Sequence, residues 1–128
     1  MKVKTAELSG RTLDFAVATA MGLRIKIEGS EFWNVTKSGE FFDHCDFTNS
    51  WFLCGSLLES ELISCYASIN PEDETVYHWC AVKEVSDYRK RRGFTDSDPK
   101  VAICRAVVAS KLGDEVDIPD ELMEVDHD

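Results

Sequence analysis

The segment from residue 98 to residue 122 constrains the fold most, because it carries both the start and the stop signals of a helix. Asp98 can cap the helix N-terminus, and Pro99 suits the first helical position, where a missing N–H costs nothing. Apolar residues then recur at helical spacing until Gly113, which can adopt the left-handed conformation that ends helices. The alternating residues 116–118 predict a short strand after it. We therefore expect a C-terminal helix against which the rest of the chain packs.

A second helix is predicted near the N-terminus. Ser9 is placed to cap it, residues 10–21 carry the helical pattern, and Gly22 can end it. Its apolar face consists of Leu13, Ala16, Val17, Ala20 and Met21. Val3 lies between two lysines and predicts a short edge strand ahead of this helix.

Between the two helices the apolar residues change to a period of two, which is typical of half-buried strands. We expect strands at residues 23–28, 31–36 and 40–42, and a hairpin made of residues 62–69 and 75–83. Residues 44–55 look irregular, and residues 84–97 are consistent with either a short helix or a long loop. The fold class predicted from this order is α+β: a single antiparallel sheet of about four to six strands covered by an N-terminal and a C-terminal helix.

Length and charge narrow the possible functions. A chain of 128 residues predicts one domain spanning residues 1–128, and the acidic residues 120–128 look like a frayed tail. The net charge of −10 opposes direct nucleic-acid binding through phosphate neutralisation. No apolar run approaches the roughly 20 residues of a membrane span, so no membrane partner is expected.

Catalytic and metal-binding patterns are weak. The five cysteines contain no C-x-x-C pair, so we expect reduced thiols in a cytosol, mostly as small core residues. Cys45 follows His44 directly, and Cys80 shares a strand face with His78; such pairs are more often ordinary sheet residues than catalytic dyads. Residues 43–46 hold carboxylate, histidine and cysteine, but without spaced ligand pairs. No metal, no cofactor and no catalytic residue is therefore predicted.

Two groups of residues are candidates for binding. The first surrounds a tryptophan that floors a ligand pocket, anchors an interface or fills the core: Asn49, Ser50, Trp51 and Gly55. The second is the concentrated cationic run at residues 89–92, from which we select Arg89, Arg91 and Arg92. These arginines are a solvated surface run, a clamp for phosphates and carboxylates, or a partner for the acidic tail of a second subunit.

Several motifs resemble those of the NinX-like proteins of tailed phages. The similar stretches are residues 8–10 and 13–18 near the start, 47–51 and 55–59 in the middle, and 108–116 and 118–122 near the end. Phe15 stands where the family usually has tryptophan, Ser56 where proline is common, and residues 87–96 match poorly. The resemblance implies a phage or prophage accessory protein made in the bacterial cytoplasm, in the setting of host takeover, recombination or evasion of defence. It carries over no catalytic residue, although the middle motif includes Asn49, Ser50, Trp51 and Gly55.

The leading functional hypothesis is a non-enzymatic binding protein, expected to be a homo-oligomer, that captures a host protein or a small-molecule ligand. A sharper version is sequestration of a nucleotide defence signal, with Arg89, Arg91 or Arg92 on its phosphates and Trp51 stacked on its base. A second class is an acidic nucleic-acid mimic that inhibits a host DNA-acting enzyme through the carboxylates of residues 114–128. A third is a hydrolase using Cys80 or Cys45 with a histidine.

Overall fold

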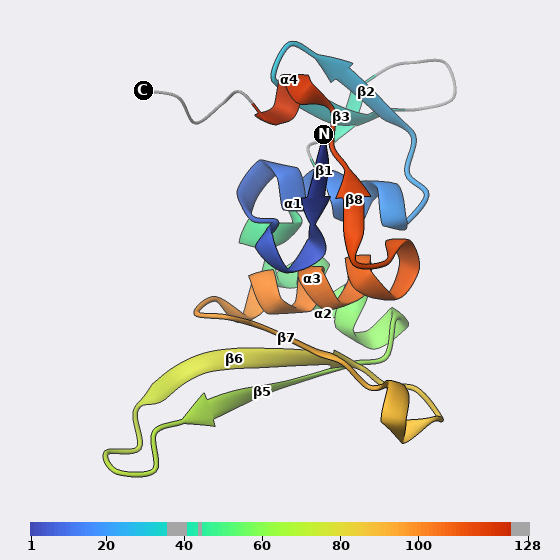
Figure 1. Cartoon of the computed structure of the whole chain (residues 1–128). Helices are drawn as coiled ribbons and strands as arrows, with labels where there is room; N and C mark the ends of the chain where they lie inside the picture. The colour runs from blue at the N-terminus through green and yellow to red at the C-terminus, as the bar shows by residue number, and fades with distance from the viewer. Residues whose placement is uncertain (36–40, 44, 124–128) are drawn as a thin grey trace.

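The computed structural model describes residues 1–35, 41–43 and 45–123 (Figure 1). The strands are β1 (Lys2–Lys4), β2 (Ile25–Glu28), β3 (Glu31–Val35), β4 (Phe41–Asp43), β5 (Ile63–Ile69), β6 (Val76–Lys83), β7 (Gly93–Asp96) and β8 (Glu115–Asp117). The α-helices are α1 (Gly10–Ala20), α2 (Trp51–Ser60), α3 (Pro99–Leu112) and α4 (Asp120–Met123), and three short 3-10 helices are η1 (Thr5–Glu7), η2 (Phe47–Asn49) and η3 (Tyr88–Lys90).

The α+β class is confirmed, but the prediction of a single sheet is wrong. The described strands form three antiparallel sheets, ordered β1–β8, β2–β3–β4 and β5–β6–β7. In Figure 1, helices α1, α2 and α3 lie between the β2–β3 strands and the β5–β6–β7 sheet. The strands do not form one sheet because of a helix that the sequence pattern did not show. This helix, α2, lies between β4 and β5 along the chain, and the chain after it continues on the opposite side of the helical layer.

Helix α3 is at the centre of the packing, as its sequence predicted. The Asp98 carboxylate accepts a hydrogen bond from the Lys100 backbone N–H at 2.9 Å, Pro99 is in the first turn, and Gly113 ends the helix with a φ of 93°. The helix contacts α1, α2 and all three strands of the β5–β6–β7 sheet. Its fully or almost fully buried residues are Ala102, Ile103, Cys104, Ala106, Val107 and Val108. This helix therefore joins most elements to one apolar core.

Helix α1 confirms the N-terminal prediction, and Ser9 is its N-cap residue. Ser9 has the extended backbone of an N-cap residue, but its hydroxyl makes no capping hydrogen bond. Its carbonyl oxygen accepts from the Thr12 hydroxyl at 2.8 Å instead. Leu8 and Leu13 are both fully buried, so the start of the helix is held by apolar packing.

The segment at residues 44–55 is not irregular throughout, and here the prediction is wrong. Ser50 is the N-cap of α2, and its hydroxyl oxygen accepts from the Leu53 N–H at 3.1 Å. Cys54 and Leu57 are the buried residues of this helix. Gly55, a residue that disfavours helix interiors, lies in the middle of α2 and obscured its helical pattern.

The predicted hairpin is confirmed by the pairing of β5 with β6. The ambiguous residues 84–97 contain both η3 and a third strand, β7, which pairs with β6. Arg105 on α3 holds this sheet to the helical layer: its guanidinium donates to the carbonyl oxygens of Leu8 at 2.9 Å and Thr95 at 2.8 Å.

The two ends of the described chain lie side by side. β1 pairs with β8, with Val3 opposite Val116, which confirms both short strands. The predicted frayed tail is wrong for residues 120–123, which form α4 with Leu122 buried; residues 124–128 lie outside the described part. No helix among the described residues is long and apolar enough to cross a membrane.

Candidate ligand-binding cleft

The cationic run at residues 89–92 begins in η3 and leads into β7. Asp87 caps this turn, and its carboxylate accepts from the Arg89 N–H at 3.1 Å. The Arg89 side chain also pairs with Asp87 but is 91% exposed. Arg91 donates to both carboxylate oxygens of Glu84, at 2.9 and 2.7 Å. Arg92 pairs with Asp114, so the three predicted arginines reach in different directions.

Arg92 is the predicted arginine that lines a cleft with other cations. The cleft has a volume of about 230 Å³, and β6, β7, α3 and the segment between the two strands contribute to its wall. Its lining residues are Lys83, Val85, Lys90, Arg92, Phe94, Ala106, Ala109 and Ser110. We call this the basic cleft.

The charge of the basic cleft is opposite to that of the whole chain. The sequence has 24 acidic residues against 14 lysines and arginines, yet the charged lining residues are Lys83, Lys90 and Arg92. Lys83 is held in place by its ammonium group, which donates to the Glu61 carbonyl oxygen at 2.5 Å. The local potential of a cleft follows its own lining more than the net charge, so an anion is favoured here.

The arrangement also provides an apolar surface. The Arg92 guanidinium lies over the Phe94 ring, 5.2 Å from its centroid. An adjoining hollow of about 560 Å³ shares Arg92 and Phe94 and extends the surface towards Lys4 and Glu115. Because both members of the Arg92–Asp114 pair are more than half exposed, the pair is weak and can exchange for a ligand anion.

A second cleft, of about 350 Å³, includes the predicted residue Asn49. Its other lining residues are Gly10, Arg11, Asp14, Glu31, Phe32, Cys45, Asp46 and Thr48. Asp14 is a buried carboxyl group here, at 7% exposure, and it accepts from the Thr48 backbone N–H at 2.8 Å and the Thr48 hydroxyl at 3.2 Å. Burial raises the pKa of the Asp14 carboxyl to about 7, although the bonds from Thr48 oppose the rise.

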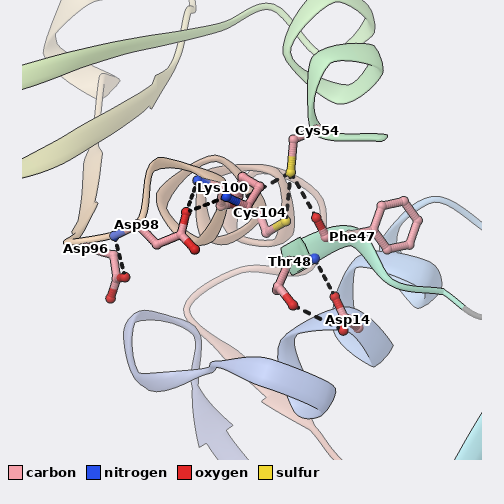
Figure 2. A network of polar contacts seen from close by, with 8 residues as sticks. All are labelled: Asp14, Phe47, Thr48, Cys54, Asp96, Asp98, Lys100 and Cys104. Atoms are coloured by element: carbon pink, nitrogen blue, oxygen red, sulfur yellow. Dashed lines mark hydrogen bonds and ion pairs between the residues drawn. The ribbon is translucent and has the colours of Figure 1, made fainter. Parts of the chain in front are cut away.

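Figure 2 shows how Asp14 belongs to a longer polar network across the helices. The Cys54 thiol on α2 donates to the Phe47 carbonyl oxygen at 3.0 Å and lies 3.9 Å from the Cys104 sulfur on α3. The contact with Cys54 and burial raise the pKa of the Cys104 thiol far above its ordinary value. Helix η2 is therefore bound to α1 through Thr48 and to α2 through Phe47, so the contacts of Asp14 and Thr48 have a structural role in joining these elements.

Trp51, the central residue of the predicted pocket, is on the surface. It is the first residue of α2, 56% exposed, with the Lys100 ammonium 4.9 Å from its ring centroid. Ser50 serves as the cap of this helix and Gly55 lies within it. Trp51 lines neither cleft, so neither brings Trp51 together with the arginines as the nucleotide hypothesis expected.

Replacing Trp51 with alanine is expected to change stability little. A half-exposed ring with one cation over it contributes about 0.5–1 kcal/mol through that contact, so Trp51→Ala should lower the free energy of unfolding by no more than about 1 kcal/mol. The buried Phe47 is the matched control, and Phe47→Ala should cost about 3–5 kcal/mol. Urea denaturation of both variants measures the difference; equal losses would contradict a surface role for Trp51.

The residues considered for catalysis are arranged as follows. His78 and Cys80 share a face of β6, where Cys80 is buried and the His78 ring is stacked on Tyr77 at 6.4 Å. Cys45 is buried, and its neighbour His44 lies outside the described residues. In the part of the chain that the structure describes, no three histidine, cysteine or carboxylate side chains converge as metal ligands do.

Of the carboxylates considered for nucleic-acid mimicry, several are engaged within the chain. Asp114 pairs with Arg92, and Asp117 and Asp120 both pair with the amino group of Met1. Glu115 and Glu121 are exposed, and the acidic residues from 124 onward lie outside the described part.

Comparison with known proteins identifies the family. The family model described as "Bacteriophage P22, NinX" matches residues 4–111 of the 128-residue chain. The chain belongs to the bacteriophage P22 NinX family. This confirms the resemblance seen in the sequence motifs. A search of curated proteins found no match for this NinX-family chain.

All lining residues of both clefts lie within the residues that the family model matches. The adjoining hollow extends beyond the matched residues only at residues 114 and 115. Sequence reasoning found Arg92 but omitted Lys83 and Lys90 from its binding residues. Lys90 lies inside the selected cationic run, so that signal was available. Lys83 is at the end of a strand, and its proximity to Arg92 follows from the path of the chain through η3.

Proposed function

We propose that this NinX-family protein is a non-enzymatic binding protein whose basic cleft captures an anionic small ligand for the benefit of the phage, in host takeover or counter-defence. The observation that carries the proposal is the lining of Lys83, Lys90 and Arg92 in a chain of net charge −10. Three cationic residues in the lining of one hollow favour an anion there.

The lining also restricts the chemistry of the ligand. Phosphate or carboxylate oxygens would accept hydrogen bonds from Lys90 and Arg92, and the guanidinium suits two such oxygens at once. Val85, Phe94 and Ala106 offer apolar contact to the rest of the ligand. The Ser110 hydroxyl, which donates to the Val107 carbonyl oxygen at 2.8 Å, still has a lone pair to accept a bond. An organic anion such as a nucleotide therefore fits better than a bare inorganic ion.

Calorimetric titration with linear and cyclic nucleotides tests this proposal. Lys90→Gln and Arg92→Gln should each weaken binding about tenfold, because a hydrogen bond to a charged group contributes roughly 1.5 kcal/mol. Arg89→Gln is the matched control: it removes a neighbouring, highly exposed arginine that lies outside the cleft, and should change the affinity less than about twofold.

Two outcomes would contradict the basic cleft as the site. One is the absence of heat with every nucleotide at low ionic strength, where charge attraction is least screened. The other is an equal loss of affinity in Arg89→Gln and Arg92→Gln. Thermal unfolding of each variant separates a loss of binding from a loss of folding, which matters because Arg92 also pairs with Asp114.

A further inference from the structure

Strand β5 has a free edge of unusual composition for this protein. In the order β5–β6–β7, one side of β5 has no neighbouring strand among the described residues. The strand is seven residues long and contains no charged residue and no proline. Every other edge strand in the described chain (β1, β2, β4, β7 and β8) has three or four residues and at least one lysine, aspartate or glutamate.

Such an edge has a physical consequence. Unpaired backbone N–H and C=O groups along an edge strand can pair with another strand, and natural proteins usually prevent this with short edges, charges or proline. β5 has none of these three protections along its seven residues. In a chain of net charge −10, it is also the edge at which a second acidic copy would meet no like charge within the strand.

The residue order of β5 is almost the same in both directions. It reads isoleucine, serine, cysteine, tyrosine, alanine, serine, isoleucine. In an antiparallel pair related by a two-fold axis, each residue faces the one at the mirrored position of the other copy. An axis at Tyr66 would place the two Tyr66 residues opposite each other, Ser64 opposite Ser68, and Ile63 opposite Ile69, so that like chemistry meets like at nearly every position.

We propose that two copies of this chain associate through β5, antiparallel and centred on Tyr66, so that their two three-stranded sheets form one continuous sheet. Half-exposed apolar side chains lie along this edge: Tyr66 and Ile69 are each 52% exposed. Leu62, next to the strand, and Phe52 on α2, which contacts β5, are also exposed. Pairing would remove part of this apolar surface from water and satisfy the backbone groups of the edge.

Disulfide trapping tests the register directly. Ser64→Cys and Ser68→Cys chains are prepared separately, mixed and oxidised. Paired positions in antiparallel strands have Cα atoms about 4.5–5.5 Å apart, which a disulfide can bridge. A covalent dimer is expected in the mixture and in neither single variant alone, because each substituted residue faces a serine in its own homodimer. Cross-linking in the single variants to the same extent, or none in the mixture, would overturn the proposed register.

Sedimentation of the full chain tests the association itself. The wild type should have twice the chain mass of 14.4 kDa, and Tyr66→Lys should be monomeric because two lysines would face each other on the axis. Tyr77→Lys is the control: Tyr77 is similarly exposed, at 60%, but belongs to the central strand β6. A monomeric wild type, or equal dissociation of both variants with folding intact by circular dichroism, would overturn the proposal.

Discussion

Asp14→Asn should remove a fall in stability that the wild type shows between about pH 4 and pH 7. Burial raises the pKa of the Asp14 carboxyl from 3.8 to about 7, so in this window the folded protein holds a proton that the unfolded chain has lost. The free energy of unfolding therefore decreases as pH rises, and the stabilisation is complete only below the unfolded pKa. A rise of about three pKa units corresponds to as much as about 4 kcal/mol by pH 8.

An asparagine side chain cannot ionise but can still accept from the Thr48 N–H. Asp14→Asn should accordingly match the wild type near pH 4 and exceed its stability near pH 8. The measurement is urea denaturation at intervals from pH 4 to pH 8, with Glu28→Gln, an exposed carboxyl on β2, as the charge-matched control. Parallel pH curves for the wild type and Asp14→Asn would show that the Asp14 carboxyl does not titrate in this range.

Ile103→Ala should destabilise the protein by about 2–5 kcal/mol, which is a large part of the stability of a domain of this size. Ile103 is fully buried on α3, and α3 contacts both α1 and the β5–β6–β7 sheet. Truncation leaves a cavity between layers that are held in place by other contacts, so the neighbours can collapse only in part.

The control for Ile103→Ala is Leu112→Ala in the last turn of the same helix. Leu112 is partly exposed, so its truncation should cost clearly less. Chemical denaturation of both variants gives the comparison. Similar costs at the two positions would mean that α3 is not the centre of the core.

The sequence alone predicted the elements whose signals are local. Asp98, Pro99 and Gly113 lie within or next to α3 and act through its own backbone, which explains why the bounds of this helix were found. The β5–β6 hairpin was likewise predicted because both its strands and its turn are contiguous. Helix α2 was missed because Gly55 and the two aromatic residues at its start, Trp51 and Phe52, resemble a loop when the buried contacts of the helix are unknown.

The candidate site was only half predictable for a related reason. The cationic run containing Arg92 can be recognised in the sequence, but the sequence alone supports an anion-binding role only as a hypothesis. Which of its arginines form ion pairs with carboxylates depends on the path of the chain through η3, because η3 brings Arg91 back to Glu84. The presence of Lys83 in the lining of the basic cleft depends on the same path of the chain.

What the sequence determined by itself is therefore helices α1 and α3, the β5–β6 hairpin, and the family to which the chain belongs. What only the tertiary structure decided is the division into three sheets, the pairing of β1 with β8 across more than a hundred residues, and the cationic lining of the basic cleft. The physical reason is the range of the interactions. Caps and periodicity act within a few residues, whereas strand partners and cleft walls are chosen by burial and charge among segments that are distant in the chain.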